Sequence, residues 1–281
     1  MDDLAGRIAA FGPFFEFEVH AAATSPVPPW HGMDELLADP LGHVTLVRTR
    51  LAAASGREPA AVELRVAASV AHLGLVARLV SPVLAAEALA AEALAGAALA
   101  AAALVGESLA AGSPDIEPPD IEPPDIWWQP EQGGVFPLSL SRNALSSDVL
   151  LAQDTARPAG VVSLLEGPVQ ELSEAFARLR VSPLILRGNV ASAVNGAATA
   201  ITRSAVAQPR VPQPPAGQSV AWRSARRALT IAMSLYEHPA LRGAATIAPD
   251  GTSFRRRSCC LIYRALPGTL CGDCVLSPRN P

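Results

Sequence analysis

The sequence predicts a mainly α fold with a small β component (α+β), made of a helical body and a short C-terminal segment. Hydrophobic residues make up 50% of the chain, and many of them are alanine, which favours helix. Apolar residues recur at helical spacing over 168–180 and 219–236, whereas strand-like alternation is confined to short stretches such as 14–20. The length of 281 residues is enough for one large domain or two modest ones.

Two helices are expected in the first half of the chain. The first should begin at Pro59, because proline suits the first position of a helix. It should break or kink at Ser81-Pro82, because proline disfavours helical geometry in the residue before it. An alanine-rich helix should follow over 83–111 and act as a packed or spacer helix.

The second half is expected to mix strands and helices. Trp127-Trp128 and residues 134–139 predict a strand pair with its turn at Gly133-Gly134. Asn189 is expected to cap a helix that runs to about Val206. This mixture is the small β component of the predicted fold.

Composition divides the chain into four predicted regions. The tandem repeat PDIEPPDIEPPDI, from Pro114 to Ile126, forbids helix and central strand and is typical of an extended linker. The predicted regions are a mainly helical N-terminal region over 1–112, this proline-rich linker over 113–126, a central α+β region over 127–250 and a C-terminal segment over 251–281.

The charge and hydropathy of the chain indicate which partners and which cellular location to expect. The net charge of −4 argues against a nucleic-acid partner, which would favour a basic face. The start Met1-Asp2-Asp3 is acidic where a secretory leader would be basic. The best candidate for a membrane span lies between Glu92 and Glu107 and is too short. We therefore expect a cytoplasmic protein and leave open a peripheral association with the inner face of the membrane.

Four cysteines lie in the last 23 residues and follow the pattern Cys-Cys-x10-Cys-x2-Cys. In a reducing compartment, four clustered cysteines favour a metal site over disulfides. A [2Fe–2S] cluster takes four thiolates, two on each iron, and tetrahedral zinc also accepts four. The adjacent pair fits the usual zinc spacing poorly, so the spacing favours iron–sulfur and leaves zinc, disulfides or free thiols as alternatives. The candidate ligands are Cys259, Cys260, Cys271 and Cys274.

The backbone around these cysteines must satisfy geometric conditions. Neighbouring side chains in a strand point to opposite faces, so Cys259 and Cys260 can both bind only if the backbone is kinked there. Pro267-Gly268 should supply the turn that returns the chain to the second pair. Gly272 should permit a tight turn inside the Cys-x2-Cys pair.

Positive charge surrounds the cysteines in the sequence. Such charge stabilises thiolates and a reduced cluster, and it would also attract an acidic electron donor. The alternative is a solvated run with no specific role. The residues concerned are Arg255, Arg256, Arg257 and Arg264.

The residues of this segment resemble the C-terminal signature of the FhuF-type ferric-siderophore reductases. The resemblance rests on Phe254 to Cys260, Tyr263-Arg264 and Leu270 to Cys274, with the cysteine spacing matched without insertion. Weaker support comes from residues 78–82 and 188–192, although Arg187 stands where the family commonly has tryptophan.

The resemblance implies a [2Fe–2S] cluster on the four cysteines. It also implies one-electron reduction of ferric iron in a hydroxamate-type siderophore, releasing Fe(II) in the cytoplasm, with the central region 127–250 contacting the siderophore. The candidates for substrate contact are Trp127, Trp128 and Asn189, for which core packing and a helix cap are the alternatives.

The source of the electron is expected to be another protein. No nucleotide-binding fingerprint for a flavin or nicotinamide is evident in the sequence, so we expect an external ferredoxin- or flavodoxin-like donor. Two alternative functions remain: a zinc-stapled binding module, and an iron–sulfur sensor of redox state or iron.

Overall fold

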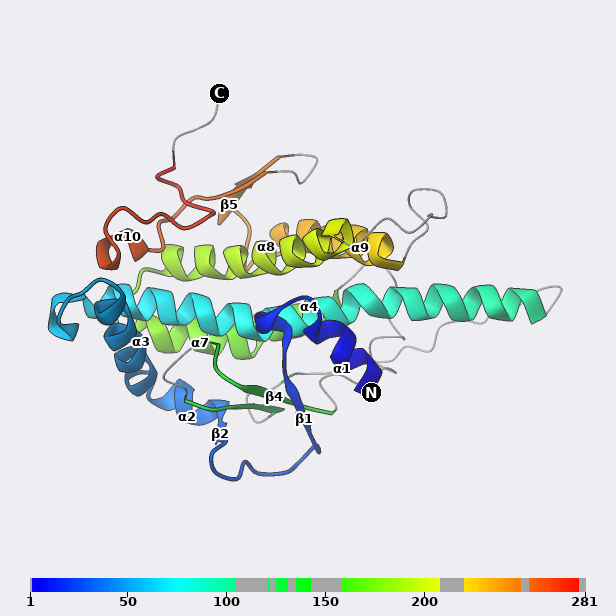
Figure 1. The fold of residues 1–281 in the computed structure, drawn as a ribbon, viewed down its shortest axis with the longest axis horizontal. Coiled ribbons are helices and arrows are strands. Elements are labelled where there is room, and N and C mark those ends of the chain that lie inside the picture. Colours follow the sequence, from blue (N-terminus) through cyan, green and yellow to red (C-terminus); the bar gives the residue numbers. More distant parts are fainter. Residues whose placement is uncertain are drawn as a thin grey trace.

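The computed structural model describes residues 2–104, 121, 125–130, 135–142, 158–207, 220–248 and 253–277. It confirms a mainly α fold with a small β component (Figure 1). The elements are α1 (Asp2–Ala9), η1 (Pro13–Phe15), β1 (Glu18–His20), β2 (His31–Gly32), α2 (Met33–Ala38), α3 (Leu41–Ala54), η2 (Pro59–Ala61), α4 (Leu64–Leu104), β3 (Ile126–Trp128), β4 (Leu138–Ser141), α6 (Ala159–Glu166), α7 (Pro168–Ala177), α8 (Pro183–Ala207), α9 (Val220–Tyr236), β5 (Ala245–Ile247), β6 (Phe254–Arg256) and α10 (Ile262–Ala265).

The 41-residue helix α4 runs through the centre of the molecule, with α8 and α9 packed along it (Figure 1). The predicted break at Ser81-Pro82 is wrong, because Pro82 lies inside this continuous helix. The Ser81 hydroxyl donates to the Ala77 carbonyl one turn earlier in the same helix, at 2.6 Å. The predicted start at Pro59 is a 3₁₀ turn, and α4 begins five residues later. The alanine-rich stretch continues the same helix as far as Leu104.

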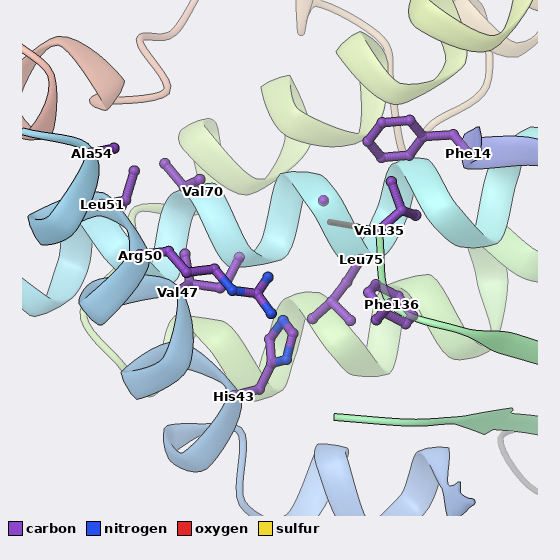
Figure 2. A pocket seen from close by; sticks show the side chains of 12 residues that line it. Phe14, His43, Val47, Arg50, Leu51, Ala54, Val70, Leu75, Val135 and Phe136 are labelled. Atoms are coloured by element: carbon purple, nitrogen blue, oxygen red, sulfur yellow. The ribbon is translucent and has the colours of Figure 1, made fainter. Parts of the chain in front are cut away.

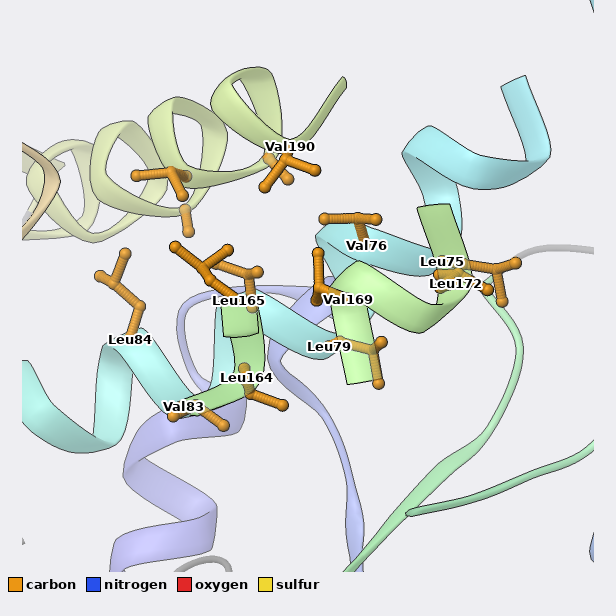
Figure 3. Close-up of a cluster of buried hydrophobic side chains, with 14 of the residues drawn as sticks. Leu75, Val76, Leu79, Val83, Leu84, Leu164, Leu165, Val169, Leu172 and Val190 are labelled. Atoms are coloured by element: carbon orange, nitrogen blue, oxygen red, sulfur yellow. The ribbon is translucent and has the colours of Figure 1, made fainter. Parts of the chain in front are cut away.

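Aliphatic side chains from four helices meet in the core (Figure 3). Leu79 and Leu84 of α4 face Leu164 of α6, Leu172 of α7 and Val190 of α8, and these side chains are buried. Each such side chain contributes about 1.5–3 kcal/mol when it is removed from water. Small alanines on α4 and α8 let these two helices approach closely, so the core is rich in helix contacts and poor in aromatic residues.

A four-stranded sheet lies on one side of the helices, in the order β1-β4-β3-β2. The predicted pairing of Trp127-Trp128 with the following strand is confirmed, since β3 and β4 are antiparallel. The turn expected at Gly133-Gly134 lies outside the described residues. The strand expected over 14–20 is divided into η1 and β1. Because β1 and β2 come from the predicted N-terminal region and β3 and β4 from later residues, the boundaries of the four regions stay predictions.

The C-terminal segment lies on the opposite side of the helices from this sheet (Figure 1). Its strand β6 pairs antiparallel with β5, with Ala245 opposite Arg256. β6 contacts α8, and the short helix α10 contacts α4. Most of the proline-rich linker falls outside the described residues.

One helix among the described residues is long and apolar enough to cross a membrane. It is the Leu64–Ala90 part of α4, with a mean hydropathy of 1.7, rather than the stretch between Glu92 and Glu107. Because 83% of its window is buried inside the protein, it has the position of a core helix and is weak evidence for a span.

Glu87 is a buried residue of α4 whose carboxyl group lies at the start of α6. Its Oε1 accepts the backbone N–H groups of Gly160 at 2.6 Å and Val161 at 3.2 Å. Burial raises the pKa of Glu87 to about 7, and these two N–H donors oppose the rise. The side chain therefore caps a helix while holding a proton more tightly than an exposed glutamate.

The raised pKa of Glu87 predicts a specific dependence of stability on pH. The folded state binds this proton more tightly than the unfolded chain, whose pKa is near 4.5. The resulting stabilisation is present below about pH 4.5 and is lost as the pH rises through about 7, up to about 3 kcal/mol in all. Glu87→Gln should remove this loss. The free energy of unfolding, measured in urea, should therefore change less between about pH 5 and pH 8 in this variant than in the wild type. Parallel profiles would contradict the assignment.

Candidate iron–sulfur site

The four cysteines lie in irregular backbone after β6. Cys260 and Cys274 are 2% and 3% exposed, whereas Cys259 and Cys271 are partly exposed. Strand β6 ends three residues before Cys259, and Leu261 has a left-handed backbone with φ of +69°. The backbone at the adjacent pair is therefore irregular rather than strand-like, and its left-handed residue directly follows the pair. The four thiols together have a buried side and a side near solvent.

Hydrogen bonds fix the positions of the thiols. The Leu261 N–H donates to Cys259 Sγ and the Leu276 N–H to Cys274 Sγ, both at 3.3 Å. A hydrogen bond between Cys260 and Cys271 lowers the pKa of Cys260 and raises that of Cys271. Thus one thiol of this pair ionises readily and the other shares its proton with it.

The thiols influence one another across both pairs. Cys271 and Cys274, which come from the second pair, lie within electrostatic range of Cys260 and Cys259. In the described ranges, no three His, Cys, Asp or Glu side chains are arranged closely enough to hold a metal ion as they stand. The cysteines would therefore have to draw together around a cluster.

The two glycines of this segment have different roles. Gly268 has φ of +79°, which L side chains rarely adopt, so the turn expected at Pro267-Gly268 is confirmed. At Gly272 the backbone is not left-handed, and an added Cβ would meet no atom within 4 Å. The prediction that Gly272 is needed for a tight turn is therefore wrong.

Arg256 is buried beside the thiols and is only 1% exposed. Its Nη2 donates to Asn189 Oδ1 at 2.7 Å and to the Ile185 carbonyl at 3.2 Å. Burial lowers the pKa of Arg256, and the nearby thiols, first of all that of Cys260, oppose this change. Buried as it is, Arg256 cannot form part of a donor-docking surface.

The remaining donors of Arg256 fit an anionic group at this site. Its Nε and Nη1 have no hydrogen-bond partner among the described residues. Unpaired buried donors of a guanidinium are costly, and an anion beside them would remove that cost. A [2Fe–2S] cluster on four thiolates is such an anion, so the residues present fit it.

Asn189 connects Arg256 to the central helix. It lies inside α8, seven positions into the helix range, and is 0% exposed, so the predicted helix cap is wrong. Its Nδ2 donates to the Ser69 carbonyl at 2.9 Å and approaches His72 Nδ1 at 3.3 Å. The Ser69 hydroxyl donates to the Cys260 carbonyl at 2.9 Å. A buried polar network therefore joins α4, α8 and the cysteine segment.

His72 is the titratable member of this network. Burial, and then the charge of Arg256, lower the pKa of His72 to about 3. Its Nε2 lies 3.0 Å from the Ser173 hydroxyl of α7. The ring is therefore neutral near neutral pH, and Arg256 supplies the positive charge of the network.

Gly188 makes room for the cysteine segment on α8. A Cβ at this position would lie 2.2 Å from Ser258 Oγ and 2.9 Å from Arg256 Nη2. The Gly-Asn pair therefore serves close approach and hydrogen bonding. Sequence reasoning missed this role, although Pro183 after Ser182 is a sequence signal that starts the helix earlier.

The other predicted arginines lie in different surroundings. Arg255 donates from Nη2 to the carbonyls of Val275 and Ser277 and holds the end of the segment. Arg264 forms an ion pair with Glu63 at 2.5 Å. Arg257 is exposed, and its guanidinium makes no hydrogen bond or ion pair within the described ranges.

The structure does not bring the two tryptophans to the cysteines. Trp127 stacks on His20 with ring centroids 3.6 Å apart, and the Trp128 indole N–H donates to the Gly32 carbonyl at 3.1 Å. Both are buried in the sheet on the other side of the helices. Packing explains both side chains, and their contact with a substrate stays a prediction.

An apolar cavity of about 310 Å³ lies between α3, α4 and the residues before β4 (Figure 2). His43 and Arg50 reach its edge, while Val47, Leu75 and Phe136 form its walls. Burial lowers the pKa of His43 to about 4, so the ring is neutral. The walls are poorly suited to a polar ferric chelate.

Comparison with known proteins points to the same segment of the chain. Residues 256–276 match the family model of the FhuF 2Fe-2S C-terminal domain, a range that includes all four cysteines. No curated protein and no solved structure matches the chain. The match points to a [2Fe–2S] cluster as the cofactor and to an iron–sulfur protein of the ferric-siderophore reductase type. Over residues 256–276 the chain is thus similar to the FhuF 2Fe-2S C-terminal domain.

Proposed function

We propose that the protein reduces ferric iron held by a siderophore, by one electron, and so releases Fe(II). The observation that carries the proposal is the match of residues 256–276, a stretch that holds the four cysteines and the buried guanidinium of Arg256. When bound, a [2Fe–2S] cluster supplies electrons one at a time. Siderophores hold Fe(III) more tightly than Fe(II), so the reduction weakens the complex. The resemblance favours a hydroxamate-type siderophore.

The residues of the site favour electron transfer in three ways. Arg256 places positive charge beside the thiolates, which stabilises added negative charge. The N–H groups of Leu261 and Leu276 donate to sulfur and support the same charge. Cys260 and Cys274 exclude water on one side, while the partly exposed Cys259 and Cys271 leave a short path to a partner at the surface.

The electron would come from an external ferredoxin- or flavodoxin-like protein. We place the reaction in the cytoplasm and leave open a peripheral contact with the inner face of the membrane. Of the predicted docking arginines, Arg257 and Arg264 are exposed, whereas Arg256 is buried. Arg257 lines a pocket beside the cysteine segment, so a donor would meet Arg264.

Anaerobic reconstitution provides the test. The reduced holoprotein, freed of excess reductant and mixed with ferrioxamine B, should bleach the ferric hydroxamate absorption and yield about one Fe(II) per cluster, trapped by ferrozine, because each cluster carries one electron. Cys260→Ser should lose cluster and activity together. If the reduced protein leaves the ferric complex intact, the reductase proposal fails and the sensor alternative gains support.

Spectroscopy of the purified protein distinguishes an iron–sulfur protein from a zinc-stapled binding module. The dithionite-reduced protein should give the electron paramagnetic resonance signal of a one-electron-reduced [2Fe–2S] centre. A colourless protein that contains zinc and no acid-labile sulfide would support the zinc-stapled binding module instead. A full cluster in Cys260→Ser would mean that the ligand set differs from the one proposed.

A further inference from the structure

A second cavity, of about 440 Å³, opens beside the cysteine segment. Three chain segments form it: the first turns of α8, the turn before β5 and the residues that follow β6. Its volume falls in the range of about 300–1,000 Å³ that is typical of small-molecule sites. The lining residues are Leu184, Arg187, Arg242, Gly243, Ala244, Arg257 and Ser258.

The lining is positively charged. Three of the lining residues are arginines, and none of the described residues that line it is an aspartate or glutamate. The pocket also lies at the N-terminal end of the 25-residue helix α8, where the helix dipole is positive. The site therefore favours an anion through three guanidinium groups and a helix end together.

Two of the arginines are held in place and the third is available. Arg187 donates to the Arg242 carbonyl at 2.5 Å, and Arg242 donates to the Glu237 carbonyl at 3.0 Å. These bonds fix the turn before β5 and leave the two positive charges at the wall. The guanidinium of Arg257 has no partner in the described part of the chain. A ligand could therefore pair with Arg257 without breaking an existing interaction.

The pocket adjoins the residues that hold the cluster. Ser258 lines it and is followed directly by Cys259, one of the two partly exposed thiols. The Ser258 hydroxyl is buried against Gly188, so the arginines rather than this hydroxyl would contact a ligand. A molecule held here lies against the segment from which an electron would leave.

We infer that this pocket binds a carboxylate of an anionic ferric chelate and thereby selects negatively charged chelates as substrates. The inference rests on the proposed function and adds the charge of the substrate to it. One electron passes from the protein to the chelated Fe(III), which becomes Fe(II), and the external donor restores that electron. The concave shape favours a small molecule over the convex surface of a donor protein.

The test compares two chelates that differ only at a remote end. Desferrioxamine B carries a pendant amine that is cationic. Succinylation of this amine replaces the positive charge with a carboxylate and leaves the hydroxamate groups that bind the metal unchanged. With redox-inert Ga(III) in the cage, calorimetry on the holoprotein measures binding without electron transfer. The succinylated complex should bind about tenfold more tightly, in line with charge-assisted contacts to guanidinium. Added salt should reduce the difference.

Arg257→Gln should bring the two affinities to within about threefold, because it removes the unpartnered charge. Arg203→Gln is the matched control: this exposed arginine lies on the same helix, about 24 Å from Arg187 at the helical rise. The control should keep the tenfold preference. Circular dichroism and iron content should be unchanged in both variants.

Each outcome bears on a different claim. Equal affinity of the two gallium complexes for the wild type would overturn the inference. It would also be overturned if Arg257→Gln changed neither affinity but slowed cluster reduction by an acidic ferredoxin, which would make this face a donor site. If the succinylated complex binds preferentially but neither ferric complex is reduced, the pocket stands and the reductase proposal fails.

Discussion

Replacing Arg256 with methionine should lower iron and sulfide content at least about tenfold, the scale at which groups supporting metal ligands act. The guanidinium is buried against the thiols, and methionine fills similar volume without charge. The apoprotein should change little in stability, because a buried charge often costs as much as its contacts return. Iron and sulfide assays with urea unfolding of the apoprotein measure the two effects separately.

The neighbouring Arg257 provides the matched control. It is exposed and unpartnered among the described residues, so Arg257→Met should retain the cluster. If Arg256→Met also holds a full cluster, the buried charge is not needed for cluster assembly. If instead the apoprotein unfolds, the hydrogen bonds of Arg256 to Asn189 and Ile185 matter more than its charge.

Alanine at Gly188 and at Gly196 should have effects of opposite sign. Both glycines lie on α8, where alanine is favoured over glycine by about 1 kcal/mol. At Gly196 an added Cβ meets nothing within 4 Å, so Gly196→Ala should stabilise the protein by up to that amount. At Gly188 the Cβ would collide with Ser258 and Arg256, and overpacking of this kind costs about 1–3 kcal/mol.

The measurement for this pair is urea unfolding together with cluster content. Gly188→Ala should be destabilised and should lose cluster, because the cysteine segment must move away from α8. Gly196→Ala should keep both properties. Stabilisation by Gly188→Ala with full cluster would show that Ser258 can rotate away freely and that close approach is not what requires this glycine.

The fold class and the cysteine segment could be predicted because their signals are local. Helical periodicity identifies α7 and α9 within a few residues, and the cysteine spacing alone favours an iron–sulfur centre. The irregular backbone at Cys259-Cys260 also follows from the local geometry of a strand. None of these inferences needs to know what packs against the segment.

The wrong predictions at Pro82, Asn189 and Arg256 share a physical cause, which is tertiary contact. Proline at position 82 normally ends a helix, but burial of residues 79–90 of α4 on all sides holds the helix through it. Asn189 is typical of a cap, yet its partners Ser69 and Arg256 come from distant parts of the chain. A run of three arginines is normally solvated, and the middle one turns inward here because β6, which pairs with β5, packs against α8.

The hydrogen bond from Ser69 to the Cys260 carbonyl spans 191 residues of sequence. Ser69 and Asn189 both lie outside the matched stretch 256–276, yet both hold it in place by hydrogen bonds. A peptide of residues 256–276 alone would lack these contacts with α4 and α8. Grafting that peptide onto another scaffold should therefore give weak and heterogeneous iron loading, and a graft that succeeds would have to bring matching pieces of α4 and α8 with it.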